Sequence, residues 1–433
     1  MNPIRFITTS FLVLFLLIPP LSAADFADID ATSKTYVLLK EDPGGDNYVS
    51  AYEYVDLELY NIGNWGLDIH SSGWIRQHMD TVPFEDEGED RGEEELTYAF
   101  LSFIPFENEK IGKLKVNMGR QFLFSGTINE HIDGISTSWD YIKFVGFSAY
   151  FGVPVDDEVD DEVCDEVCDE VGERRLTQIA GGRVYYRIAN HAEIGLSYLN
   201  VKDNKLDTPY REEIGLDLWA QPFDLVSIQG LSTYNDQTNN IMGHEYTITF
   251  FPMQSLSVSG LYAHINYNDY FVPSTSAAFL PEILNDGEEM DKYGGTVNYQ
   301  VNDKINATFD YINYSYDISG SANYYGVGFS SDNISGFLAG ASMHRMDGDT
   351  AELTYTLSRL YVGRKIWELD VVLDGVYLHL DESNAEKDYA LSSTCNVTYQ
   401  MNDSLKFSSN IAYLEDSLND HATEALFSMN YEF

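Results

Sequence analysis

Apolar and polar residues alternate with a period of two along most of this chain. The pattern is clearest in residues 293–301, 366–374 and 404–413, where aromatic and aliphatic side chains share one parity and polar side chains the other. Because successive side chains of a β-strand point to opposite faces, each run predicts a strand with one apolar face. Such runs begin by about residue 34, so we expect an all-β fold.

The length of these runs separates a membrane barrel from a soluble β-sandwich or β-helix, which would also alternate. The runs exceed the ~5–6 residues usual for soluble strands, and they match the ~9–11 residues that a tilted strand needs to cross a bilayer. No segment of the chain approaches ~18 consecutive apolar residues. A membrane-spanning form must therefore be a closed barrel, and we expect a transmembrane antiparallel β-barrel.

The segments between the runs alternate between short and long. We expect tight turns at 189–191, 221–224, 252–254, 302–303, 363–365 and 402–403. We expect longer polar segments at 235–241, 266–288, 381–387 and 415–420. Outer-membrane barrels have short periplasmic turns and longer external loops. Counting strands backwards from Phe433 at the periplasmic end places the acidic stretches 77–93 and 154–174 outside.

The number of strands follows from the same count. About 21 candidate strands follow residue 48, and a bacterial barrel needs an even number. The run 34–40 supplies one more and gives about 22 strands, whereas about 20 remain if the irregular region 126–140 folds inward as a loop.

So wide a barrel is not filled by its own side chains, and inserted loops are expected to constrict it. The candidate loops are 77–93, 123–135 and 266–288.

The N-terminus has the features of a secretory signal peptide. Arg5 precedes an apolar run over residues 11–18, and Ser22 and Ala24 are small residues at the −3 and −1 positions of a cleavage site. The apolar run is too short to span a bilayer, which disfavours an uncleaved anchor. We expect residues 1–24 to be removed and residues 25–433 to form a single barrel domain.

Composition and charge narrow the possible partners. The chain is 44% hydrophobic and holds 31 Tyr and 24 Phe against 5 Trp, which suits the aromatic girdles of a barrel. Its 70 acidic and 25 basic residues give a net charge of −45. Nucleic acid is excluded as a partner because phosphate binding needs clustered Lys and Arg. The acidity suits either solvated loops or a lumen that favours cations.

One parity of the strands gathers charged side chains and is expected to face the lumen. The candidate pore-lining residues are Asp56, Glu58, Arg183, Arg187, Glu193, Asp217, Asp310, Glu368, Asp370 and Asp374. Acids in a wet lumen favour cations, and facing arginines create a transverse field. The same pattern also suits a wet face without selectivity. A missed β-bulge would reverse the parity of all later residues in a strand.

The last strand carries an apolar face that ends at the C-terminus. Its members are Ala425, Phe427, Met429, Tyr431 and Phe433. A terminal aromatic residue preceded by this alternation resembles the recognition signal of outer-membrane barrel assembly. The resemblance implies the barrel assembly machinery, outer-membrane lipid and lipopolysaccharide as partners, and the bacterial outer membrane as the location.

A second resemblance lies within residues 48–140. The runs 53–58 (Glu-Tyr-Val-Asp-Leu-Glu), 72–76 (Ser-Gly-Trp-Ile-Arg) and 119–121 (Gly-Arg-Gln), followed by 133–135 (Asp-Gly-Ile), resemble porin-type barrels of metal-respiring and sulfate-reducing bacteria. That resemblance implies a channel for passive diffusion of small solutes or ions. In some of these families the barrel instead sheathes a multihaem cytochrome as an electron conduit.

Arg120 does not fit the lumen-facing parity. It shares the parity of Val116 and Met118, on the lipid side. Either a bulge turns the side chain inward, or Arg120 lies at the membrane interface with its charged head in water.

The segment 156–171 repeats Asp-Asp-Glu-Val twice and then Cys-Asp-Glu-Val twice. Such a density of acids repels itself and favours a solvated loop. A weak Ca²⁺ site is the alternative, although the glycine-turned geometry of a dedicated calcium loop is absent. Its candidate ligands are Asp156, Glu158, Asp160 and Glu162. Cys164 and Cys168 can close a small disulfide ring, whereas Cys395 lies within a strand and is expected to be inert.

No local motif indicates catalysis. The nine histidines are scattered, and the chain has no Gly-x-Ser-x-Gly, no His-Glu-x-x-His and no phosphate loop. It also has no Cys-x-x-Cys-His for covalent haem. A barrel enzyme such as a lipase or protease, its site assembled from distant strands, is the third alternative. The chain is otherwise expected to be a cation-preferring channel that needs no cofactor.

Overall fold

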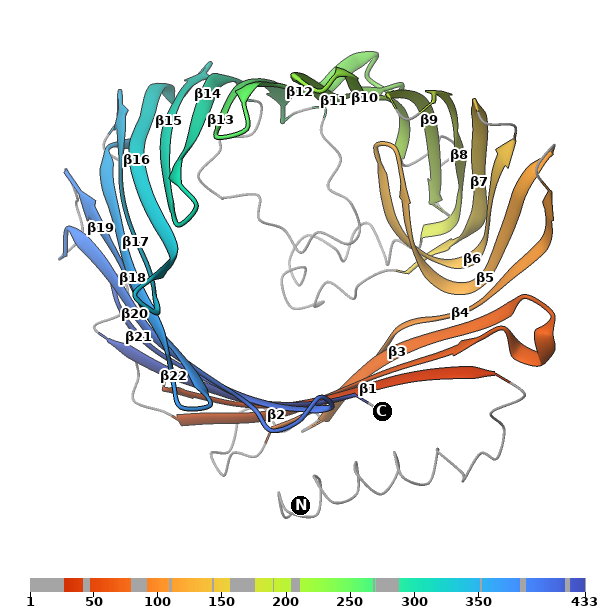
Figure 1. Ribbon diagram of the computed structural model, residues 1–433. Coiled ribbons are helices and arrows are strands. Elements are labelled where there is room, and N and C mark those ends of the chain that lie inside the picture. Colours follow the sequence, from red (N-terminus) through yellow and green to blue (C-terminus); the bar gives the residue numbers. More distant parts are fainter. Residues whose placement is uncertain are drawn as a thin grey trace, which may run out of the picture.

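The computed structural model is a barrel made of one continuous antiparallel sheet (Figure 1). It describes residues 27–41, 47–78, 92–108, 111–141, 144–155, 176–189, 191–203, 211–267, 269, 288–350, 353–381, 387–416 and 421–432. Within these ranges the sheet has 22 strands, and the one short helix, η1 (Ile62–Asn64), lies in a turn. The all-β fold predicted from the alternation is confirmed.

The strands are 10 to 17 residues long. The first eleven are β1 (Asp28–Glu41), β2 (Asn47–Tyr60), β3 (Leu67–His78), β4 (Gly92–Asn108), β5 (Gly112–Ser125), β6 (Ile128–Tyr141), β7 (Val145–Pro154), β8 (Leu176–Ile188), β9 (Ala192–Asp203), β10 (Arg211–Phe223) and β11 (Val226–Asn235). The others are β12 (Asn240–Met253), β13 (Leu256–Asn266), β14 (Glu289–Asn302), β15 (Ile305–Tyr316), β16 (Gly320–Ile334), β17 (Phe337–Gly348), β18 (Tyr355–Ile366), β19 (Leu369–Leu380), β20 (Tyr389–Gln400), β21 (Leu405–Glu415) and β22 (Ala422–Glu432).

Each strand pairs with its neighbours in the chain, and β1 pairs with β22 to close the ring. The register of that closing pair sets Thr32 opposite Glu432 and Lys40 opposite Glu424. The run 34–40 is therefore part of β1, the strand that makes the number of strands even, as predicted. The 20-strand alternative is wrong, because residues 128–141 form β6, which pairs with both β5 and β7.

The outer face of the barrel is apolar. Val184, Leu196 and Leu360 lie on one parity of their strands and are 59%, 57% and 66% exposed. Large aliphatic side chains this exposed over a whole sheet would be unfavourable in water and are expected against lipid. Phe427 lies on this outer parity at 44% exposure. Phe433 falls outside the described residues.

The two ends of the barrel differ in the length of their connections. At the end where β22 finishes, two residues join β10 to β11, β12 to β13, β14 to β15 and β16 to β17. The expected turn at 363–365 is wrong, because β18 continues to Ile366 and the turn is formed by Trp367 and Glu368. Trp367 adopts a positive φ of 57° there. No helix in the described ranges is long and apolar enough to cross a membrane.

Candidate functional site: an inserted hairpin and a charged lumen wall

The β5–β6 hairpin leaves the wall and curves into the ring toward β9 and β10 (Figure 1). Its neighbours stop short of its tip, since β4 pairs with β5 only as far as Arg120, and β7 pairs with β6 only from Ile132 onward. The tip, residues 121–131, is thus not paired with β4 or β7. The sequence singled out 123–135 as a constricting loop, and the structure brings its first part inside the barrel while keeping strand pairing within the hairpin.

Three glycines lie in a row where the hairpin bends. Gly119 pairs with Gly134, and Gly134 pairs with Gly152 on the next strand. A Cβ built on any of them would overlap the backbone of an adjacent strand. Glycine at these positions lets neighbouring backbones approach closely, as a sharply bent sheet requires.

An apolar cluster holds the hairpin against the inner face of β7, β8 and β9. Its members come from the hairpin and from the wall and are at most 7% exposed: Leu123, Ile128 and Ile132, then Tyr150, Ile179, Leu199 and Val201. The cluster has the composition of a small hydrophobic core inside the barrel. Removing this surface from water stabilises the docked position.

A buried ion triad adds to the docking. Arg211 at the start of β10 donates from Nη1 to Glu130 Oε1 of the hairpin at 2.7 Å, and from Nε to Glu213. Glu130 is 1% exposed and Arg211 is 6% exposed. A charge buried to this degree depends on its partners, so the triad fixes the position of the hairpin relative to β10.

The turn of the hairpin rests on the wall through small residues. Thr127 Oγ1 lies 2.7 Å from Ser197 Oγ of β9, and Ser125 Oγ lies 2.6 Å from Ser148 Oγ of β7. Gly126 has a φ of +66°, and a Cβ there would overlap the side chain of Asp217. The glycine therefore serves both the turn and the close approach to the wall.

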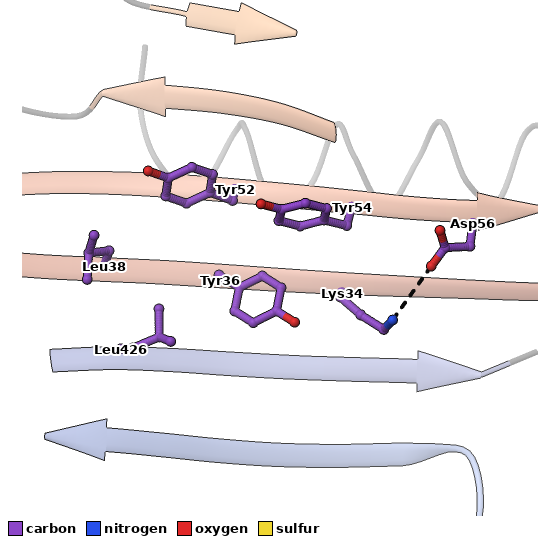
Figure 2. A pocket seen from close by; sticks show the side chains of 7 residues that line it. All are labelled: Lys34, Tyr36, Leu38, Tyr52, Tyr54, Asp56 and Leu426. Carbon is purple, nitrogen blue, oxygen red and sulfur yellow. Dashed lines mark ion pairs between the residues drawn. The ribbon is translucent and has the colours of Figure 1, made fainter. Parts of the chain in front are cut away.

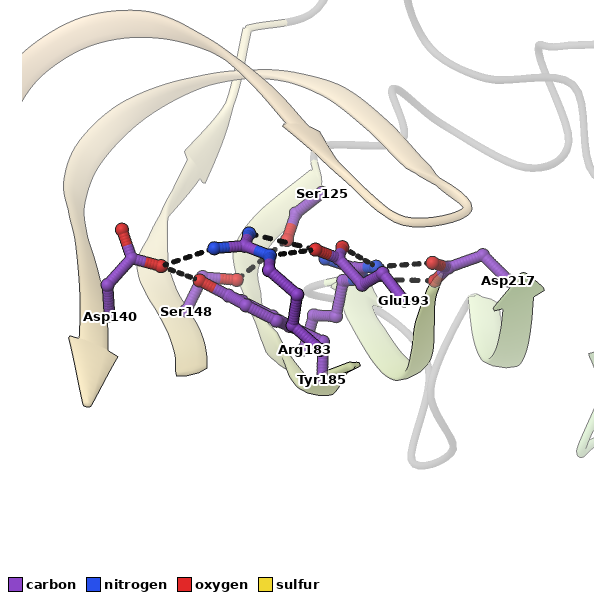
Figure 3. Close-up of polar contacts among 8 residues, drawn as sticks. Ser125, Asp140, Ser148, Arg183, Tyr185, Glu193 and Asp217 are labelled. Carbon is purple, nitrogen blue, oxygen red and sulfur yellow. Dashed lines mark hydrogen bonds and ion pairs between the residues drawn. The ribbon is translucent and has the colours of Figure 1, made fainter. Parts of the chain in front are cut away.

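Beneath this turn, side chains of opposite charge form a network on β8, β9 and β10 (Figure 3). Arg183 donates from Nε to Asp217 Oδ1 at 2.9 Å and from Nη2 to Glu193 Oε1 at 2.8 Å. Arg187 binds the other oxygen of Glu193 at 2.8 Å. The parallel hydrogen bonds of the guanidinium hold both carboxylates in fixed orientations. Of the ten predicted lining residues, these four share one site.

Tyr185 extends the network toward β6. Its ring lies between the two arginines, with the guanidinium carbons of Arg183 and Arg187 at 4.8 and 5.2 Å from its centroid. Its hydroxyl donates to Asp140, which also lies 3.8 Å from Arg187. The cation–π contacts and ion pairs thus join Asp140, Tyr185 and the two arginines in one network.

The face of the hairpin turned away from the wall is aromatic. Phe122 stacks on His131 with ring centroids 4.1 Å apart, and Phe124 stacks on Phe122 at 6.3 Å. Phe124 is 76% exposed. In β5 these phenylalanines continue the lipid-facing parity, but beyond the bend that face turns away from β7–β10 into the lumen.

Two other predicted residues lie on the inward face of β2. Asp56 accepts a hydrogen bond from Ser72 and lies 3.6 Å from Lys34 Nζ. Glu58 accepts a hydrogen bond from Tyr60 and lies 3.2 Å from His70 Nδ1.

The remaining predicted lining residues do not form one cluster. Asp310 on β15 accepts from Thr296 at 2.7 Å, whereas Asp374 on β19 pairs with Arg359 on β18. Asp370 lies on the same inward parity of β19. Glu368 is the exception, because it lies in the turn before β19 and not in the row of strand carboxylates.

Two outward-facing arginines are each paired with a carboxylate. Arg120 keeps the lipid-side parity without a local bulge and binds Asp133 through two hydrogen bonds of 2.9 Å. Arg345 binds Asp381 through two hydrogen bonds of 2.6 Å, which lower the pKa of that carboxyl. No bulge turns the Arg120 side chain inward, and its location at the membrane interface stays a prediction.

The candidate calcium ligands Asp156, Glu158, Asp160 and Glu162 fall outside the described residues, as do Cys164, Cys168 and the signal peptide. Most of the predicted loops 77–93 and 266–288 does so too. In the described ranges no group of three or more His, Cys, Asp or Glu side chains is arranged to hold a metal ion. Cys395 is a half-buried free cysteine on β20.

Sequence reasoning missed the residues that dock the hairpin. Glu130 and Arg211 are 81 positions apart, and no period-two pattern relates residues that meet across a lumen. The nearest signal was the glycine content of 119–152, which marks close backbone approaches without showing where the hairpin goes.

Closure of the sheet, an apolar exterior and unequal connections together define a transmembrane β-barrel of the bacterial outer membrane. No protein-family description matches the sequence, and no curated protein matches it.

Solved structures resemble this chain only at low identity. The P pilus usher (PapC) translocation pore is 11% identical with a TM-score of 0.46, covering 93% of this chain and 99% of that one. Pseudomonas aeruginosa OccK9 (OpdG) is 12% identical with a TM-score of 0.46, covering 94% and 98%. Acinetobacter baumannii OccAB2 is 9% identical with a TM-score of 0.44, covering 94% and 98%. Similarity at this level does not identify a solute or a transport mechanism for this chain.

Proposed function

We propose that this chain is an outer-membrane porin-type channel for passive diffusion of small solutes or ions, narrowed by the β5–β6 hairpin. The observation that carries the proposal is the docked hairpin, whose tip lies in the lumen while the sheet stays continuous through the paired parts of β5 and β6. A lumen that is lined by charge and narrowed by an inserted segment selects solutes by size and charge. This passive mechanism needs no chemistry from the protein.

A preference for cations is a finer part of the proposal. The net charge of −45 attracts cations to the channel mouths. Several inward carboxylates are neutralised by arginine or lysine, as Glu193, Asp217 and Asp374 are. Glu58 and Asp310 instead face histidines, and no Lys or Arg pairs with them in the described part of the chain. These two acids are therefore the candidates for the negative charge that attracts cations inside the lumen.

Planar-bilayer recording of the purified protein tests both parts. The proposal predicts discrete open-channel steps and, in a KCl gradient, a reversal potential of the sign for cation selectivity. Protein that inserts without ever giving steps would contradict the channel. Anion selectivity would overturn only the charge preference.

A sheath around a multihaem cytochrome is the second candidate, because a barrel of 22 strands is wide enough to enclose a partner. Haem that co-purifies with the barrel in a fixed ratio would favour the sheath. A haem-free preparation with full conductance favours the channel.

A further inference from the structure

A second sector of the lumen wall, on β1, β2 and β3, carries aromatic side chains instead of an ion network. Tyr52 and Tyr54 lie along β2 with rings 6.5 Å apart and only 18° from parallel (Figure 2). Trp74 on β3 lies 6.5 and 6.4 Å from them. Tyr36 on β1 meets Tyr54 edge-on at 5.4 Å. We call these four residues the aromatic shelf.

Three residues of the shelf, Tyr36, Tyr52 and Tyr54, line a cavity of about 430 Å³ with polar groups at one end. Lys34 and Asp56 lie 3.6 Å apart there, and Leu38 and Leu426 line the other end. All of these side chains have the inward parity, because Leu38 pairs with Leu426 whereas Val37 pairs with the outward-facing Phe427. A mostly apolar pocket with a few placed polar groups is the usual form of a small-molecule site.

We propose that the aromatic shelf is a binding subsite for neutral saccharides on their way through the channel. Pyranose rings carry an apolar C–H face, which packs on the electron-rich face of an aromatic ring, and a rim of hydroxyl groups. Tyrosine hydroxyls donate and accept hydrogen bonds, the Lys34 ammonium donates, and the Asp56 carboxylate accepts. The shelf thus offers a matching partner to both parts of a sugar.

The charge balance of the pocket favours a neutral ligand over an ion. Lys34 and Asp56 cancel each other, so neither a cation nor an anion gains from the lining as a whole. A purely aromatic solute would leave this pair without ligand hydrogen bonds. The lining runs from Lys34 to Leu38 along β1, about 13 Å at the rise of a strand, which is longer than one sugar ring.

This inference rests on the proposed channel, but it is tested by binding that does not depend on conduction. Titration calorimetry of the purified barrel with maltotriose is expected to give saturable binding. Sorbitol, an open-chain polyol without a ring face, is expected to give none. The double variant Tyr52→Ala/Tyr54→Ala should weaken binding roughly tenfold or more, the loss of two stacking contacts. Tyr52→Phe/Tyr54→Phe keeps the rings and should retain most of the affinity.

The matched control is Tyr324→Ala, which removes an aromatic ring stacked on His344 in a different sector of the barrel. It should leave maltotriose affinity unchanged. No saturable binding to the wild type, or equal affinity in the double alanine variant, would overturn the subsite. Open-channel steps without sugar binding would refute only the subsite, whereas sugar binding without steps would refute only the channel.

Discussion

Arg183 is the residue on which the charged wall depends, because it binds two carboxylates from two other strands. We expect Arg183→Gln to make the lumen more negative and to raise the K⁺/Cl⁻ permeability ratio about two- to fivefold, since a unit charge a few ångströms from an ion is worth ~0.5–1 kcal/mol in water. Reversal potentials in a KCl gradient measure this ratio. An unchanged ratio, or a lower one, would contradict the role of Arg183 in neutralising the wall.

Arg359→Gln is the matched control for that charge change. Arg359 also faces the lumen and pairs with Asp374, but its side chain is 54% exposed against 11% for Arg183. Both variants should shift selectivity in the same direction. Only Arg183→Gln should also disturb the inserted hairpin, because only Arg183 lies under its turn.

Gly126 gives a second prediction at the scale of single residues. Gly126→Ala and Gly336→Ala both place a Cβ at a positive φ. This backbone strain destabilises the folded state of each variant by about 1–2 kcal/mol. A Cβ at Gly126 also overlaps Asp217, whereas nothing lies within 4 Å of one at Gly336. The open-channel current should become larger or noisier in Gly126→Ala alone. Identical single-channel traces for the two variants would show that the turn does not rest on the wall.

At the scale of elements, the β5–β6 hairpin should come loose when its ion triad is broken. Arg211→Ala removes the guanidinium that binds the buried carboxylates of Glu130 and Glu213. Removing one partner of a buried ion pair typically destabilises the folded state by ~3–5 kcal/mol. In a Thr127→Cys background, a membrane-impermeant maleimide should label residue 127 much faster once Arg211 is replaced.

The parent without the introduced cysteine gives the background labelling, and Arg359→Ala is the control for loss of a lumen arginine far from the triad. Equal labelling rates at position 127 with and without Arg211 would mean that the triad does not hold the hairpin.

The elements were largely predictable because the alternation reports local geometry. The run 34–40 gave the strand that closes the ring, and the run 404–413 coincides closely with β21. The turn before β19 was misplaced because Trp367 looked like another apolar strand residue, although it adopts a turn conformation. The bend of the hairpin was hidden because its two strands keep their alternation on both sides of Gly119 and Gly134.

The charges of the site were also predictable one by one, but their pairing was not. Parity gathered Arg183, Arg187, Glu193 and Asp217 on one face without showing that the arginines neutralise those acids. Contacts between strands that are not neighbours, such as Arg211 with Glu130, depend on the path of the hairpin through the lumen. No local pattern encodes that path.

At the scale of the whole molecule, the barrel has three distinct surfaces. Its exterior is apolar and suits lipid, its inner wall on β8–β10 holds a docked hairpin and an ion network, and its wall on β1–β3 carries the aromatic shelf. The wall does not need the hairpin tip for closure, because residues up to Arg120 and from Ile132 already pair with β4 and β7. The tip can therefore be removed while the barrel is kept.

Single-channel conductance with and without that tip tests the central claim most directly. The variant replaces residues 122–131 with Asn-Gly, a two-residue hairpin turn, and its heat-modifiable migration on gels checks that the barrel has folded. We predict discrete steps for the wild type and a conductance increased about twofold or more for the variant, since removing an inserted segment widens a lumen of this strand number. Equal conductance of the two folded barrels, or no steps from either, would contradict a channel narrowed by its own hairpin.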